Sequence, residues 1–516
     1  MANRYSDILF QLIHSLEKAE KRHFKLYIKR SSAKEDLKII QLFDALDKME
    51  EYDERILFKK IRSVTKPQLA NLKTHLYKEV LASLRLLKTS DNIDLQLSEM
   101  LDYARILYNK GLKIQSLRIL EKAKEQARLH HKFNTLVQLL SLEKKIEILH
   151  ITRSPTEKTQ SLADESTAIG QHIDRVTRLS NLALLLYRWY VQNGHSRNEA
   201  DEKDIRAYFR EQLPKDIHHV SGFYENLYLC QSYCWYAFIR QDFLMYYRYA
   251  QKWVTLFEEE PLLKSIETGH YLKGVHALLN AHFDLRNFRA FDETLSAFKL
   301  FEASDIARKY DNFRTQTSLY ITVATINGHL MKGSFSEGVK MIPEIKQKLS
   351  DYALYVDHHR IMVFNYKIAT LYFGNEDYDK AIDYLQEIIN SPIELRIDLH
   401  SYARLLHLMC HYELGNYDIL DGLVKAVHRF MLRMKNLTVV EEKIFRFIRK
   451  NYISPQDIRE GLKPLLESIR HLEKNRHETR AFAYLDIISW LESKVNNTGM
   501  QAVIQQKYWK SKRVGN

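Results

Sequence analysis

The chain has 516 residues, of which only 15 are Gly and 8 are Pro, and its net charge is +13. Average usage of Gly and Pro together is roughly 12%, so this composition excludes a sheet protein rich in tight turns and favours long helices. With 45% apolar and 28% charged residues it also excludes wholesale disorder, and three cysteines are too few for a disulfide framework and fit a reducing compartment.

The start of the chain, MANRYSDILFQLIHSLEKAEKRHFK, has no run shaped like the core of a signal peptide. The purest apolar run, LALLLY at 182–187, is too short to cross a bilayer, which takes about 20 residues. We therefore expect a soluble, cytoplasmic protein that does not enter a membrane.

Residues 1–90 form the first predicted element, a basic N-terminal module of four or five helices with 19 Lys and Arg against 12 Asp and Glu. Within EKAEKRHFKLYIKR at 17–30, helical spacing aligns four basic side chains along one stripe and puts Phe24 and Ile28 on another face. The members of this basic stripe are Lys18, Arg22, Lys25 and Lys29. Three hypotheses stay open for it: a solvated face, a surface for an acidic protein, or a nucleic-acid contact.

The module ends in a predicted long helix, TKPQLANLKTHLYKEVLASLRLL at 65–87, that begins with a capping box of Thr65 and Gln68. A short helix, ILFKKI at 56–61, precedes it. A short helix, a tight turn and a longer basic helix have the outline of a helix-turn-helix, although the turn at 62–66 lacks the glycine often found there.

Residues 95–435 are predicted to consist of about eight helical hairpins, two of them with weaker turns near 153–155 and at 193–194. The first clear hairpin is predicted at 108–127, in YNKGLKIQSLRILEKAKEQA. Five similar turns follow it, each closed by an aromatic residue. These aromatics are spaced 39–47 residues apart: Phe243, Phe288, Phe335, Tyr378 and Tyr417. A recurring unit of this length indicates a repeat architecture, since one hairpin cannot bury its own apolar face and stacked neighbours can.

The sharpest unit is YKIATLYFGNEDYDKAIDYLQEII at 366–389. Small residues at Ala369 and Ala381 suit a close helix crossing, Gly374 and Asn375 suit a left-handed helix end, and Asp377 suits an N-cap. This unit resembles the tetratricopeptide repeat, whose period of 34 residues is shorter than the one here. The resemblance implies an all-α, right-handed α-solenoid with a concave groove for a partner peptide or helix.

Helical caps are expected at both ends of the array. Residues 436–495 look like the C-terminal cap, because AFAYLDIISWLESKV at 481–495 is strongly amphipathic. The basic tail 496–516 is expected to be mobile, although Tyr508 and Trp509 could dock.

Tyrosine is unusually frequent, with 31 residues. Four consecutive residues in a dense aromatic stretch are candidates for the partner surface, because Tyr and Arg make good binding anchors. They are Tyr246, Tyr247, Arg248 and Tyr249. They follow one another on a helix, so at least one should be exposed.

Other constellations predict no metal, cofactor or enzymatic chemistry. Cys230 and Cys234 face one side of a helix and fit buried packing. Three histidines share one repeat position, six residues before an aromatic: His282, His329 and His411. Neighbouring helices lie about 8–10 Å apart, too far for one ion to bridge successive repeats, and the phosphate-loop, dinucleotide, zinc-protease and serine-hydrolase motifs are absent.

The leading functional hypothesis is a non-enzymatic scaffold or adaptor that binds a protein or peptide, with no small-molecule substrate evident. The alternative is a regulator whose basic N-terminal helices bind nucleic acid while the solenoid senses a partner. That layout is similar to bacterial response regulators and peptide sensors that join a helical module to such repeats.

Overall fold

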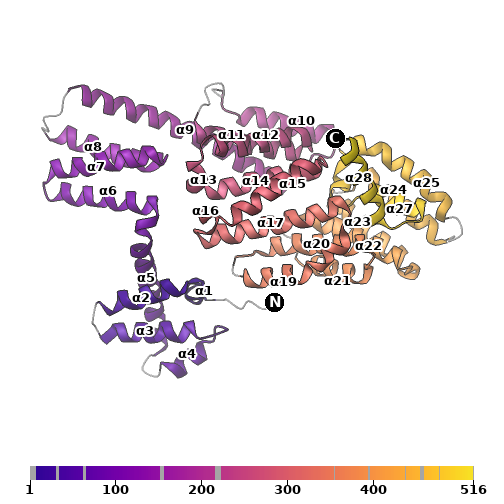
Figure 1. Cartoon of the computed structure of the whole chain (residues 1–516), viewed down its shortest axis with the longest axis horizontal. Coiled ribbons are helices and arrows are strands. Elements are labelled where there is room, and N and C mark those ends of the chain that lie inside the picture. The colour runs from indigo at the N-terminus through magenta and orange to yellow at the C-terminus, as the bar shows by residue number, and fades with distance from the viewer. Residues whose placement is uncertain are drawn as a thin grey trace. The chain divides into compact units, whose positions relative to one another are not determined.

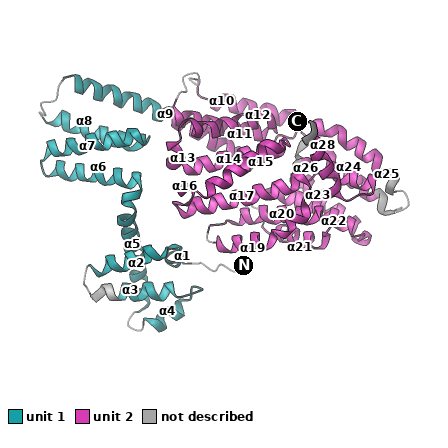
Figure 2. Ribbon diagram, in the orientation of Figure 1, with its two compact units in different colours: residues 1–173 teal, residues 174–516 magenta. Residues whose placement is uncertain are grey.

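A computed structural model describes residues 7–30, 34–61, 65–150, 156–215, 222–353, 355–392, 396–435, 437–453, 458–475 and 477–514. All regular structure in these residues is helical and they contain no β-strand, which confirms the predicted all-α class (Figure 1). The chain divides into two compact units, residues 1–173 and residues 174–516 (Figure 2).

Unit 1 contains two separate hydrophobic cores. Its helices are α1 (Ile8–Ser15), α2 (Lys18–Lys29), α3 (Lys34–Asp47), α4 (Glu54–Lys60), α5 (Lys66–Lys88), the 3₁₀ turn η1 (Thr89–Asp91), α6 (Ile93–Asn109), α7 (Lys113–Leu129), α8 (Phe133–Leu149) and the first part of α9 (Thr156–Asn193). Phe10, Phe24 and Phe43 are buried in the core of α1–α5. The predicted capping box at the start of α5 is confirmed, because the Thr65 N–H donates to Gln68 Oε1 at 2.9 Å.

Unit 2 begins within α9 and continues through a series of paired helices. They are α10 (Glu199–Gln212), α11 (Phe223–Ile239), α12 (Phe243–Glu259), α13 (Leu262–Ile266), α14 (Thr268–Asp284), α15 (Phe288–Glu302), α16 (Asp305–Arg308), α17 (Asp311–Lys332), α18 (Phe335–Lys340), α19 (Ile342–Asp351), α20 (His358–Gly374), α21 (Tyr378–Ile389), α22 (Ile397–Glu413) and α23 (Tyr417–Arg433). The C-terminal helices are α24 (Val439–Ile453), α25 (Ile458–Arg470), η4 (His471–Lys474), α26 (Thr479–Tyr484), α27 (Ile487–Asn496) and α28 (Met500–Val514). Each of α11, α14, α20 and α22 packs against the helix that follows its turn.

Seven turns among the described residues share one backbone geometry. In each, a residue with left-handed φ lies two positions before the next helix: Gly111, His131, Gln241, Arg286, Gly333, Glu376 and Gly415. The N–H just before that helix donates to the carbonyl five residues earlier, at 2.7–3.1 Å, which is the bond of a Schellman helix end. The five aromatics predicted to follow matching turns are each the first residue of a helix.

The unit at 366–389 differs in detail from its predicted turn. Glu376 takes the left-handed conformation at φ 65°, whereas Gly374 is the last helical residue of α20. Asp377 does not cap α21 with its side chain, because its carboxylate instead accepts from Lys380 Nζ at 2.7 Å. Ala369 and Ala381 are fully buried, as a close crossing of α20 and α21 requires.

The left-handed turn before α23 gives a paired prediction. Gly415 has φ +73°, so Gly415→Ala should lower the free energy of unfolding by about 1 kcal/mol. Gly422 lies inside α23, and no atom lies within 4 Å of the position that a Cβ would take there, so Gly422→Ala should raise the free energy of unfolding by about 0.5–1 kcal/mol. Urea unfolding of both variants measures the two signs, and equal effects would contradict the assignment of the turn.

The C-terminal segment corrects the expectation of a mobile tail. Residues 500–514 form α28, and four of its apolar side chains are buried: Met500, Val503, Ile504 and Tyr508. The Tyr508 ring lies 4.9 Å from that of Phe288, and Gln505 Nε2 donates to the Gly333 carbonyl at 3.0 Å. The apolar residues recur at helical spacing and dock on two hairpin turns, so burial orders this segment.

Helices α26 and α27 extend this docking along unit 2. The Tyr366 hydroxyl donates to the Tyr484 carbonyl at 3.3 Å, and Arg286 Nη2 lies 2.9 Å from Asp486 Oδ2. Trp490 is fully buried and its Nε1 donates to Glu413 Oε1 at 2.5 Å. The C-terminal helices therefore contact the hairpins that begin with α14, α17, α20 and α22.

Two contacts join the region around α10 to residues after α23. Arg197, just before α10, donates from Nη1 to the Lys435 carbonyl at 3.1 Å. His477 Nε2 lies 4.0 Å from Glu202 Oε2 on α10. Residues at the start of α10 therefore contact the segments that follow α23 and precede α26.

Candidate functional site

The predicted basic stripe lies on α2 of unit 1. Lys18, Arg22 and Lys29 are exposed, while Lys25 Nζ lies 2.7 Å from Asp44 Oδ1 on α3. A second pair links the same two helices, with Lys21 Nζ 2.6 Å from an Asp47 oxygen. Acidic residues of α3 thus offset part of the charge of α2, and three of the four predicted residues remain available at the surface.

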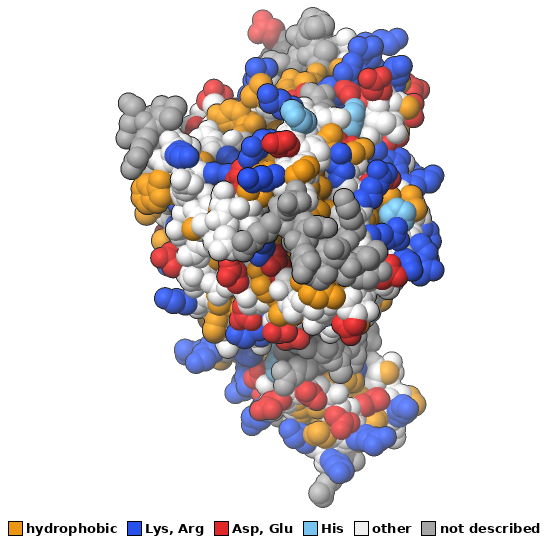
Figure 3. Space-filling model, turned by 90° about the vertical axis from the view of Figure 1, so that its right-hand side faces the viewer, with side chains coloured by type: hydrophobic (Ala, Val, Ile, Leu, Met, Phe, Trp, Pro, Cys, Tyr) orange, Lys and Arg blue, Asp and Glu red, His pale blue; other side chains and the backbone are white. Residues whose placement is uncertain are grey.

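The face of the molecule drawn in Figure 3 has a mixed charge pattern. It carries basic and acidic side chains among hydrophobic ones.

The short and long helices of the predicted helix-turn-helix are α4 and α5, but residues 62–64 of its turn lie outside the described residues. Its turn geometry therefore stays a prediction.

The four aromatic-stretch candidates on α12 do not form one surface. Tyr246 is only 8% exposed and belongs to the core of unit 2, so its proposed role as a partner anchor is wrong. The half-buried Tyr249 stacks on Tyr233 with ring centroids 4.1 Å apart, and burial raises the pKa of Tyr249 to about 12. Tyr247 is half-buried beside His282, and Arg248 is exposed, as helical geometry requires of at least one of the four.

Two of the three histidines in register contact a side chain of the following turn. His329 Nδ1 is 2.8 Å from Ser334 Oγ, and His411 Nδ1 is 2.9 Å from Asn416 Nδ2. Burial lowers the pKa of all three imidazoles. Within the described ranges no three His, Cys, Asp or Glu side chains are grouped to hold a metal ion, and all three cysteines, including the Cys230 and Cys234 pair, are buried.

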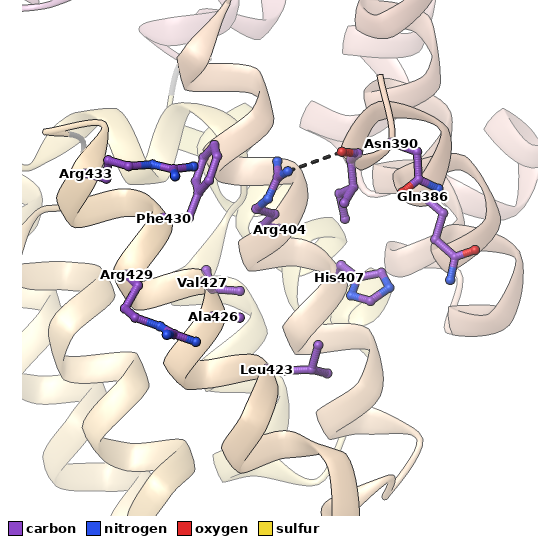
Figure 4. A pocket seen from close by; sticks show the side chains of 11 residues that line it. Gln386, Asn390, Arg404, His407, Leu423, Ala426, Val427, Arg429, Phe430 and Arg433 are labelled. Atoms are coloured by element: carbon purple, nitrogen blue, oxygen red, sulfur yellow. Dashed lines mark hydrogen bonds between the residues drawn. The ribbon is translucent and has the colours of Figure 1, made fainter. Parts of the chain in front are cut away.

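An open groove of about 810 Å³ lies between α21, α22 and α23 of unit 2. Arg404 and His407 project from α22, and Arg429, Phe430 and Arg433 from α23 (Figure 4). The apolar lining comes from Ile389, Leu423, Val427 and Phe430. We call this the arginine groove.

Arg404 is the most enclosed cation of the arginine groove. Its Nη1 donates to the His400 carbonyl at 3.1 Å, and its Nη2 donates to the Ile389 carbonyl at 3.2 Å, the dashed line in Figure 4. Its guanidinium lies 4.0 Å from the centroid of the Phe430 ring, and that of Arg433 lies 5.7 Å from the same ring. Burial and then the charge of Arg433 lower the pKa of Arg404.

The groove is cationic at neutral pH through its arginines. Burial, followed by the nearby His411 and Arg404, lowers the pKa of His407 to about 4, so His407 is neutral there. Its Nε2 is buried without a hydrogen-bond partner among the described residues. The lining contains no carboxylate, and none of the three arginines has an ion pair with a described acidic residue.

Sequence reasoning missed the arginine groove. Arg429 and Arg433 stand one helical turn apart in HRFMLRMK at 428–435, a signal for two cations on one face of α23. Arg404 lies 25 residues earlier, and only the packing of α22 on α23 brings it to the same place.

No protein-family model matches this chain, and no curated protein matches its sequence. In the described part of the chain, no helix combines the length and the apolar character that crossing a membrane would take.

Proposed function

We propose that this protein is a non-enzymatic, cytoplasmic scaffold or adaptor, and that its hairpins form a right-handed, tetratricopeptide-like α-solenoid that binds a segment of a partner protein. The single observation that carries the proposal is the arginine groove, an open hollow built by three successive helices of the hairpin series. Grooves lined by apolar and aromatic side chains with a few polar groups are typical binding sites.

The location of the groove modifies the hypothesis of a concave binding surface. That surface would be lined by the first helices of the hairpins, but α26–α28 contact four of the hairpins. The arginine groove instead uses the second helices α21 and α23 with α22 between them. A partner segment that docks there displaces none of these C-terminal contacts.

Quantitative affinity capture from the native lysate tests the proposal. The full chain is compared with Arg429→Gln/Arg433→Gln, which alters two exposed groove residues. The control Arg289→Gln/Arg446→Gln removes the same charge from side chains that are 84% and 81% exposed outside the groove. We expect a partner that the parent and the control retain and the groove variant loses; identical protein sets from all three would contradict the proposal.

The alternative function, nucleic-acid binding by α2, is favoured by the exposure of Lys18, Arg22 and Lys29. Phosphate contacts predict steep weakening of binding between roughly 50 and 200 mM salt. The charge reversal Lys18→Glu/Arg22→Glu/Lys29→Glu should then abolish the retention of DNA or RNA in a filter assay.

A matched control for that assay is Lys110→Glu/Arg118→Glu/Lys122→Glu, which reverses two exposed lysines and one exposed arginine on the α6–α7 hairpin. If the wild-type chain retains no DNA or RNA at low salt, the alternative fails. Equal loss in both triple variants would also count against a specific role for α2.

A further inference from the structure

We propose that the arginine groove recognises a protein segment that combines a carboxylate with a neighbouring apolar side chain. This inference rests on the proposed function and names the chemistry of the partner. Arg404, Arg429 and Arg433 provide three guanidinium groups around one hollow without a lining carboxylate. Guanidinium groups match carboxylates through paired N–H donors, so an acidic side chain is the complement that this surface lacks.

The apolar floor of the groove favours a segment that carries both a carboxylate and an apolar side chain over an anion without apolar groups. Phe430 is 7% exposed, and the guanidinium groups of Arg404 and Arg433 both lie within about 6 Å of its ring, at 4.0 and 5.7 Å from the centroid. Leu423 and Val427, two turns and one turn before Phe430 on α23, extend this floor. An apolar side chain of the partner that covers them would exclude water and strengthen the adjacent ion pair.

The helix ends around the groove disfavour a dense anion such as phosphate. Ile389 is the last residue of α21 and Arg433 the last of α23, so both helices bring their C-terminal ends to the groove. Such ends carry partial negative charge, and the Ile389 carbonyl already accepts from Arg404. A singly charged carboxylate meets less repulsion there than a phosphate of nearly two charges.

Selection from a random peptide library on the immobilised full chain tests the inference. Parallel selections use Arg429→Gln/Arg433→Gln and the matched control Arg289→Gln/Arg446→Gln, and circular dichroism checks that the variants fold. We expect the parent and the control to enrich peptides in which Asp or Glu neighbours an apolar residue. Anisotropy measurements on the best peptide should show about tenfold weaker binding to the groove variant.

Amide versions of that peptide, with Asn for Asp and Gln for Glu, provide the decisive arm. The amide peptides should bind the unmodified protein about as weakly as the acidic peptide binds Arg429→Gln/Arg433→Gln. Added inorganic phosphate should compete poorly with the acidic peptide. Enriched peptides without acidic residues, or equal binding of acid and amide peptides, would overturn the inference while leaving a scaffold in place. Enrichment of no peptide by the parent or the control would count against the proposed function itself.

Discussion

Replacing Asp398 with Ala is expected to lower the free energy of unfolding by about 3 kcal/mol, because it removes the buried carboxylate that pairs with the half-buried Arg396 guanidinium. The Asp398 side chain is 7% exposed, and Arg396 Nε donates to its two oxygens at 2.9 and 3.0 Å. The Tyr484 hydroxyl also donates to Asp398 and accepts from Arg396 Nη2 at 3.2 Å. The substitution would leave Arg396 without its carboxylate and loosen α26 from α22.

Two comparisons make this prediction specific. Asp398→Asn keeps the shape and one acceptor oxygen and should cost less than Asp398→Ala. Asp383→Ala on the exposed side of α21 should change the free energy of unfolding by only about 0.5 kcal/mol. Urea unfolding with hydrogen exchange of residues 479–496 measures both effects, and equal stabilities of Asp398→Ala and Asp383→Ala would contradict the network.

Gly374→Ala is expected to destabilise the protein by about 1–3 kcal/mol through overpacking. A Cβ at this position would lie 2.5 Å from two ring carbons of Phe335, and Phe335 is 2% exposed. Phe335 begins α18 of the preceding hairpin. The absence of a Cβ at Gly374 therefore makes room for a side chain of the neighbouring hairpin. The midpoint and slope of urea unfolding give the change in the free energy of unfolding.

The double variant Gly374→Ala/Phe335→Leu separates this contact from a general effect of the glycine. Because the smaller side chain makes room for the new methyl group, the two changes together should cost less than the sum of the single variants. Gly422→Ala serves again as the helical control with open space around it. A Gly374→Ala protein as stable as Gly422→Ala would show that the two hairpins are not packed as described.

The local pattern of the chain predicted the all-helical class and the positions of several helix starts, because turns and apolar periodicity are encoded by neighbouring residues. Each of the five spaced aromatics begins a helix. The identity of the left-handed residue was less predictable, since Glu376 takes that conformation in place of Gly374, and the Asp377 N–H bond to the Tyr372 carbonyl holds it there. Gly374 is needed at this helix end because the Phe335 ring packs against it, and not because of its backbone conformation.

Features that join distant residues were harder to predict. Met500, Val503, Ile504 and Tyr508 follow helical spacing and could have indicated α28, but their partners Phe288 and Gly333 are far away in sequence. The arginine groove likewise needs side chains from three helices. Tyr246 was misassigned because an aromatic anchor and a core aromatic have the same local pattern.

Site-specific photocrosslinking tests most directly the central claim that the α21–α23 groove is the partner surface. A benzophenone side chain is placed at Gln386 or Ala426, two exposed positions of the groove, and at exposed Arg289 as the control. We expect irradiation in the native lysate to join a discrete protein to both groove positions through an acidic segment, and not to the control. Adducts of equal yield at all three positions, or none at the groove, would contradict it.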